Sequence, residues 1–258
     1  MSAFYRVLIA GLVLIPWVIV ARARPNHRTR NVSTRACAVA VAGGVFFALD
    51  LALWNTAVMK TQAAVASILG NNTPIVVGIL SWIVFRRRPR ASFWLGLGLA
   101  LAGCLLIMSA SLRGAARGSL SGNALALVAC VFFAAYLVVT ERVRRSMDTL
   151  TFNALAIAGS IATLLVICLV LDLPLSGFST RTWASLAGLG LISQLMAYYA
   201  LVYALGHLPA TITSVGLLAQ VPCTALLAWL LLGEPLTPVQ LTGGAIVLAG
   251  IWVVNRDS

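Results

Sequence analysis

The chain has 258 residues, of which 61% are hydrophobic and only 9% are charged, and its formal net charge is +12. A soluble domain carries roughly a quarter charged residues, so this composition excludes a water-soluble globular protein and indicates one embedded in lipid. The positive charge does not indicate nucleic-acid binding, because the basic residues lie mostly in short gaps between apolar segments, which is typical of membrane topology.

The apolar segments predict nine membrane-spanning helices. A bilayer core of about 30 Å needs about 20 apolar residues per helix. Segments of this kind lie near 3–20, 37–58, 63–85, 92–111, 121–140, 150–171, 183–205, 211–232 and 239–254. The gaps between them are too short for a soluble domain. We therefore expect an all-α integral membrane bundle.

The basic residues in the gaps predict the orientation. One set of alternate gaps, with the C-terminal tail, holds 13 of them: Arg22, Arg24, Arg28, Arg30, Arg35, Arg86, Arg87, Arg88, Arg90, Arg142, Arg144, Arg145 and Arg256. The other set holds five: Arg6, Lys60, Arg113, Arg117 and Arg181. Positively charged loops stay in the cytoplasm. We expect the first set and the C-terminus on the cytoplasmic side of a cell inner membrane.

The sequence repeats itself at an offset of 147 to 148 residues. Pro74 matches Pro222, and in the following segment Gly96 matches Gly243 and Gly103 matches Gly250. Five spans separate each residue from its copy. Because five is odd, the copies cross the membrane in opposite directions, as in the inverted repeats of secondary transporters. The predicted halves are 1–115 and 116–258.

These motifs are similar to those of a known family. Asn72-Thr73-Pro74, Arg86-Arg87-Arg88-Pro89, Gln220-Val221-Pro222 and Leu231-Leu232-Gly233-Glu234-Pro235-Leu236 resemble the EamA repeat of the drug/metabolite transporter superfamily. The resemblance covers nearly the whole chain and implies ten helices that transport small solutes. It makes 1–115 family helices 2–5 and 116–258 helices 6–10.

The chain departs from the family pattern in two places. Phe85-Arg86 stands where the family has Gly-Glu, so a role for that glutamate cannot be assigned in both halves. The segment 4–10 resembles the start of the family's second helix. We therefore expect the genomic sequence upstream of Met1 to encode a further apolar run of about 20 residues in frame.

Asp50 is the carboxylate that lies well inside a predicted span, and the nearest cation in its own helix, Lys60, is ten residues away. Such a group is expected to be protonated or to find a partner elsewhere. Trp54 shares its helix face, as Gln194 and Tyr198 share another, and Tyr198 is the repeat counterpart of Asp50. These residues suit an amino-acid-like or cationic solute. The alternatives are a structural hydrogen bond for Asp50 and simple packing for the aromatic rings.

Two prolines predict broken helices at corresponding positions of the halves. Asn71 and Asn72 precede Pro74, and Gln220 precedes Pro222. A proline inside a helix frees the carbonyl four residues earlier. Paired breaks point to a central binding site in a transporter. Kinks that serve only packing are the alternative.

The sequence thus predicts a permease that exports small metabolites, amino-acid-like compounds or drugs by alternating access. A passive facilitator or channel shares all of these features, and an intramembrane enzyme is a weaker alternative because His27 and His207 have no acidic neighbour in sequence. The spacing of the cysteines and histidines predicts no metal site, and we expect no cofactor. A small-molecule solute and the lipid bilayer are the expected partners, with proton coupling and a homodimer left open.

Overall fold

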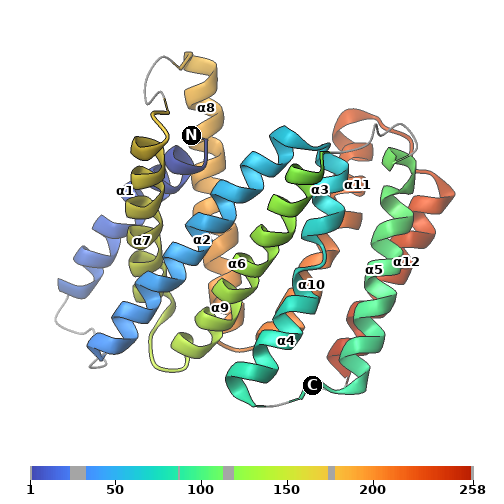
Figure 1. Cartoon of the computed structure of the whole chain (residues 1–258), viewed down its shortest axis with the longest axis horizontal. Coiled ribbons are helices and arrows are strands. Elements are labelled where there is room, and N and C mark those ends of the chain that lie inside the picture. Colours follow the sequence, from blue (N-terminus) through green and yellow to red (C-terminus); the bar gives the residue numbers. More distant parts are fainter. Residues whose placement is uncertain (1, 24–32, 87, 113–118, 174–177, 257–258) are drawn as a thin grey trace. The chain divides into compact units, whose positions relative to one another are not determined.

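The computed structural model describes residues 2–23, 33–86, 88–112, 119–173 and 178–256, whose regular elements are all helices (Figure 1). Nine segments in this part of the chain are long and apolar enough to cross a membrane. They match the nine predicted spans, so the all-α membrane fold is confirmed: Ser2–Val20, Thr34–Lys60, Ala63–Phe85, Ala91–Ser109, Leu120–Arg144, Thr149–Val170, Thr180–Leu205, Ala210–Leu232 and Pro238–Arg256. The loop arginines predicted at 24, 28, 30, 87, 113 and 117 lie outside the described residues.

The chain forms two compact units. One comprises Met1–Ala52 and Ala135–Leu208, and the other comprises Leu53–Ala134 and Pro209–Ser258. Each unit therefore contains helices from both predicted sequence halves. Helices α2 (Thr34–Lys60) and α6 (Leu120–Arg144) contribute to both units, because the boundaries fall inside them.

In the first unit, α1 (Ser2–Ala23) packs against α7 (Thr149–Val170) and against a π-helical segment, η1 (Leu189–Ala197). Gly44 of α2 allows the helix backbone to approach Ala156 of α7, and the Ser160 hydroxyl donates a hydrogen bond of 2.8 Å to the Gly44 carbonyl. Asp148 and Ser179 cap helix N-termini by accepting backbone N–H bonds from Thr151 and Thr182. The further helices of this unit are α1 (Ser2–Ala23), α7 (Thr149–Val170), α8 (Thr180–Gly188), η1 (Leu189–Ala197) and α9 (Tyr198–Leu205).

The second unit is built on a long contact between α5 (Ala91–Leu112) and α12 (Pro238–Arg256), which lie side by side in Figure 1. Apolar side chains of both helices, including Leu97, Ile107 and Val247, are buried in one core. The helices of this unit are α3 (Ala63–Gly70), α4 (Thr73–Phe85), α5 (Ala91–Leu112), α10 (Ala210–Gly216), the 3₁₀ segment η2 (Leu217–Ala219), α11 (Gln220–Leu232) and α12 (Pro238–Arg256).

Glycines bring the backbones of α5 and α12 together at two points. A β-carbon on Gly96 would lie 2.5 Å from the Gly250 carbonyl oxygen, and one on Gly103 would lie 2.6 Å from the Gly243 carbonyl oxygen. Gly96 contacts Gly250, and Gly103, which comes later in α5, contacts Gly243, which comes earlier in α12. The two helices therefore run antiparallel. Two helices at corresponding positions of the sequence repeat thus run in opposite directions, as an inverted repeat requires.

Positive φ angles also mark equivalent ends of the two repeats. Arg86 follows α4 with φ 54°, and Gly233 follows α11 with φ 71°. These positions are 147 residues apart. The structure therefore aligns Arg86 with Gly233, one residue away from the alignment with Phe85 that the sequence suggested.

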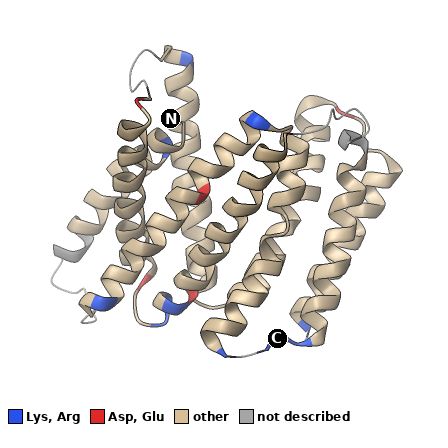
Figure 2. Cartoon of the chain, viewed as in Figure 1, with Lys and Arg blue, Asp and Glu red and all other residues tan. Residues whose placement is uncertain are grey.

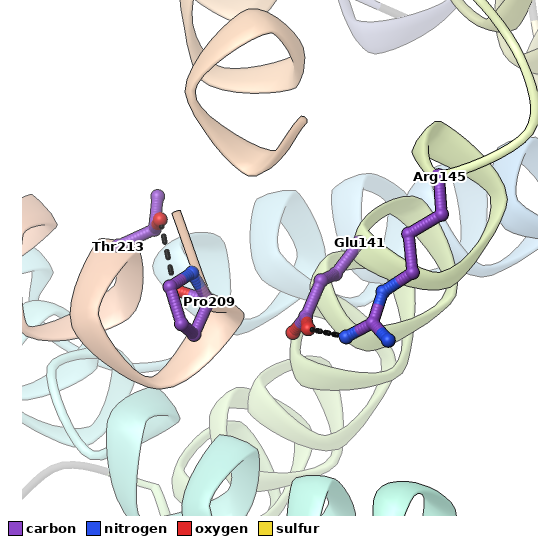
Figure 3. Close-up of polar contacts among 4 residues, drawn as sticks. All are labelled: Glu141, Arg145, Pro209 and Thr213. Atoms are coloured by element: carbon purple, nitrogen blue, oxygen red, sulfur yellow. Dashed lines mark hydrogen bonds and ion pairs between the residues drawn. The ribbon is translucent and has the colours of Figure 1, made fainter. Parts of the chain in front are cut away.

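The last turn of α6 carries charges that the sequence placed just beyond the span. Glu141 is buried and accepts a 2.7 Å bond from Arg145 (Figure 3). Arg144 donates from Nε to the Val202 carbonyl at 3.1 Å and from Nη1 to the Met147 carbonyl. Arg144 thereby connects α9 to the turn that follows α6.

In the second unit, the Thr213 hydroxyl donates a hydrogen bond to the Pro209 carbonyl at 3.1 Å, at the start of α10 (Figure 3).

Candidate functional site

Asp50 lies within α2, ten residues before its last residue, among apolar neighbours on both sides. Figure 2 shows an acidic position part-way along this helix, whereas basic positions gather at helix ends. The Asp50 side chain is partly exposed, and it makes no hydrogen bond or ion pair with any residue of the described chain. A carboxylate at this depth in lipid is costly unless another group or a proton neutralises it.

The charge that acts on Asp50 comes from another helix. Arg6 interacts electrostatically with Asp50, although the two side chains do not form an ion pair. Arg6 is the fifth residue of α1, and its Nε atom is buried with no hydrogen-bond partner among the described residues. Arg6 is one of the five basic residues assigned above to the outer set, and α1 includes it in its second turn. The orientation itself stays a prediction.

Gln194 lies in η1, next to α1. Its side chain is only 2% exposed, and its Oε1 atom has no hydrogen-bond partner in the part of the chain that is described. Gly190, about one π turn earlier, approaches α1 so closely that a β-carbon there would lie 3.0 Å from the Arg6 carbonyl oxygen. The close approach places Gln194 one turn along η1 from the level of Arg6.

Tyr198 connects this helix to α2. Its ring meets that of Phe47 edge-on, with centroids 4.6 Å apart, and Phe47 also contacts the ring of Tyr136 at 5.0 Å. Phe47 precedes Asp50 by three residues on one helix face. Tyr198 accordingly interacts electrostatically with both Asp50 and Arg6.

These contacts define a polar cluster within the first unit, formed by Arg6, Asp50, Gln194 and Tyr198. Its members come from α1, α2, η1 and α9, and they include one positive charge, one carboxylate, one amide and one phenol. Two of its polar atoms, Arg6 Nε and Gln194 Oε1, are buried without partners among the described residues. Buried polar groups are usually satisfied, so the cluster can accept hydrogen bonds from, and donate them to, a bound solute.

The predicted residues Trp54, Asn71 and Asn72 lie in the second unit: Trp54 belongs to α2, and Asn71 and Asn72 lie at the interruption between α3 and α4. The Trp54 ring covers Gly70, where a β-carbon would lie 2.7 Å from Trp54 Cζ3. The Asn72 amide donates to the Ile68 carbonyl at 3.0 Å and to the Leu69 carbonyl at 3.2 Å, and the Asn71 amide faces the Met108 sulfur at 3.8 Å. The Asn72 amide therefore stabilises the interruption locally, and the Asn71 amide connects it to α5.

The carbonyl that Pro74 leaves without its helical partner is that of Gly70. It accepts hydrogen bonds from the Thr73 hydroxyl at 2.8 Å and from the Cys130 thiol at 3.6 Å. Side chains in the same unit thus satisfy the break that the sequence predicted as part of a solute site.

The corresponding break in the other repeat is the 3₁₀ segment η2, which precedes Gln220 and Pro222. The Gln220 side chain is exposed, and the Pro222 ring lies near Gly244 of α12, with a β-carbon distance of 3.4 Å. Helices are therefore interrupted at equivalent places in both repeats. The predicted site residues fall into different environments: Asp50, Gln194 and Tyr198 lie in the polar cluster, and the others lie in the second unit.

No group of three or more His, Cys, Asp or Glu side chains in the described part of the chain is arranged to hold a metal ion. Cys104, Cys130 and Cys168 are buried in the helices and form no disulfide with one another. The polar cluster is thus the arrangement of functional groups that the first unit offers to a small molecule.

Comparison with known proteins gives the family. The sequence matches the EamA-like transporter family over residues 1–109 and 120–256. A Bacillus subtilis transporter, YwfM, is 29% identical over 255 residues, covering 97% of this chain and 82% of that one. CntI of Pseudomonas aeruginosa, a pseudopaline exporter, is 27% identical over 216 residues, with coverage of 83% and 73%. One crystal structure, 18% identical, shares the fold with a TM-score of 0.78 over 99% of this chain and 86% of that chain. The chain therefore belongs to the EamA-like transporter family, and it is a multi-pass membrane transporter.

Proposed function

We propose that this transporter exports a small metabolite, amino-acid-like compound or drug across the cell inner membrane by alternating access, and that the polar cluster binds the solute. The observation that carries this proposal is a pair of buried polar atoms without partners among the described residues: Arg6 Nε, whose charge acts on Asp50, and Gln194 Oε1 in η1, which packs against α1. In lipid an unsatisfied polar group costs several kcal/mol. A bound solute would recover that free energy.

Asp50 also supplies a simple means of coupling to protons. A carboxylate in a lipid-spanning helix can be neutralised either by a cationic group of the solute or by a proton. If solute and proton compete for Asp50, each displaces the other, and export of solute can be driven by proton entry. Among the described residues, Arg6 and Tyr198 are titratable groups that interact electrostatically with this carboxylate, and Tyr136 contacts the Phe47 ring one turn before it.

Transport by a carrier and flow through a channel are separated by counterflow in proteoliposomes. Vesicles loaded with unlabelled solute should accumulate labelled solute transiently above its equilibrium level if the site is exposed to one side at a time. A passive channel would only equilibrate the label. The transporter and exporter names of the relatives support transport rather than an intramembrane enzyme activity.

Substitution of Asp50 tests the site. Asp50→Asn should reduce solute transport driven by an imposed pH gradient by about tenfold or more, while the protein remains inserted and monodisperse. Asp172→Asn is the matched control, because Asp172 is an exposed carboxylate after α7. Wild-type gradient-driven transport by Asp50→Asn would reject the proposed role.

A further inference from the structure

Arg6 and Asp50 carry opposite charges, and the two side chains attract each other without forming an ion pair. They interact electrostatically, and no ion pair joins them in the described chain. Neither Arg6 Nε nor the Asp50 side chain has a hydrogen-bond partner among the described residues. Opposite charges that serve only to neutralise each other in a low-dielectric environment are stabilised by direct contact. Here both remain available to other groups.

We infer that Arg6 is the specificity-determining residue of the polar cluster, and that its guanidinium binds an anionic group of the solute while Asp50 binds a cationic group. This inference rests on the proposed function, because it assigns a role within the same site. The planar fork of a guanidinium matches a carboxylate or a phosphate with two parallel hydrogen bonds. A lysine ammonium has no such fork.

The other members of the cluster fit the same assignment. Gln194 Oε1 is an acceptor without a partner in the described chain, and it can take a second N–H of an ammonium group whose charge faces Asp50. The Tyr198 ring packs edge-on against Phe47, and its phenol interacts electrostatically with both charges. The solute's cationic end would therefore meet two acceptors, and its anionic end would meet the guanidinium.

Net charge explains why both ends are needed. A solute with one positive and one negative group enters a site with one negative and one positive group, so every charge is compensated. A solute with only an ammonium group would leave Arg6 uncompensated and repelled. A solute with only a carboxylate would do the same to Asp50. Arg6 thus selects against simple cations, which a site with Asp50 alone would accept.

The test compares solutes with matched carbon skeletons. For each of leucine and phenylalanine, the zwitterion is compared with the amine that lacks the carboxylate and with the acid that lacks the ammonium group. Binding to the purified full chain is measured from the ligand-induced rise in its thermal transition. We expect the wild type to bind the zwitterions at least about tenfold more tightly than either relative, a difference of about 1.4 kcal/mol.

The variants should change selectivity in opposite directions. Arg6→Gln should lose this preference and bind the amine as tightly as the zwitterion, and Asp50→Asn should do the same for the acid. Arg6→Lys keeps the charge without the fork and should retain the preference with weaker affinity. Arg181→Gln is the control, because Arg181 is an exposed arginine in α8. If Arg6→Gln folds poorly, the selectivity of Asp50→Asn and Arg6→Lys still decides the question.

The inference is overturned if Arg6→Gln keeps the wild-type preference, or if the wild type binds amines as tightly as zwitterions. It is also overturned if the wild type binds no member of either series. Counterflow of a simple cation together with failure of all zwitterions would overturn the role of Arg6 and leave solute transport standing. Absence of counterflow for every solute tested would count against the proposed function itself.

Discussion

Gly96 and Gly250 meet backbone to backbone, and the repeat counterparts of these two residues, Gly243 and Gly103, meet in the same way. When a pair of residues and the pair formed by their repeat copies make the same contact, the contact has two-fold symmetry. The α5–α12 interface is therefore a pseudo-symmetric interface inside one chain. Its closeness depends on the absence of side chains at four positions.

Enlarging one of these glycines should destabilise the second unit. A β-carbon on Gly250 would lie 2.5 Å from the Gly96 carbonyl oxygen, so Gly250→Val must separate the helices. We expect a loss of about 1–3 kcal/mol of unfolding free energy, as for other overpacked interiors. Thermal unfolding in detergent measures the effect. Gly98→Val is the matched control on α5, because a β-carbon at Gly98 has no atom within 4 Å. Equal losses for the two variants would contradict the close contact.

Arg86 should be a site where glycine stabilises the protein. A non-glycine residue in the left-handed region costs about 1–2 kcal/mol, and Arg86 has φ 54°. Arg86→Gly should therefore raise the thermal transition, in line with the glycine found at the equivalent position 233. Arg86→Ala removes the same charge but keeps the β-carbon, so it should give no gain. A gain of similar size for Arg86→Ala would assign the effect to charge.

Arg144 should stabilise the end of α9. Arg144→Gln loses the charged donors to the Val202 and Met147 carbonyls, and we expect a cost of about 2 kcal/mol. Arg142→Gln, at an exposed position of the same turn, should cost little. Gly206→Ala offers a second test, because its β-carbon would lie 2.9 Å from Arg144 Cζ. A stabilising Gly206→Ala would show that the guanidinium is not held there.

The orientation predicted from the basic residues is tested by cysteine labelling of whole cells. In a background without the five native cysteines, Arg88→Cys lies in the loop expected in the cytoplasm and Arg181→Cys in one expected outside. A membrane-impermeant reagent should label position 181 and should reach position 88 only after permeabilisation. Immediate labelling at position 88 would reverse the assignment.

Hydropathy was sufficient to predict the spans, because a lipid-facing helix must be apolar along its whole length. The repeat likewise singled out the four glycines that meet across α5 and α12, but it did not predict that Gly96 contacts Gly250 rather than its own copy, Gly243. Lys60 and Arg144 show where such reasoning loses accuracy, since both lie within helices rather than in the gaps. Long basic side chains tolerate this position because they extend towards a helix end.

The polar cluster was only partly predictable. Asp50 stood out as a carboxylate in an apolar segment, but Arg6 did not, because a basic residue near the end of a span is usually a topological signal. The π-helical form of 189–197 has no distinctive sequence pattern, and it determines how Gln194 approaches α1. The Asn72 amide donates to carbonyls of the preceding helix, α3, and this local hydrogen bonding competes with solute binding in a way that composition does not reveal.

The position of Arg6 has a consequence for biogenesis. The ribosome makes Arg6 44 residues before Asp50, so at a few residues per second α1 leaves the ribosome seconds ahead of the carboxylate that acts on it. An arginine inside a helix resists entry into lipid by up to about 2.5–3.5 kcal/mol at the centre of the bilayer. Stable insertion of α1 is therefore tied to the arrival of α2, and the two helices are expected to leave the translocon together as a hairpin.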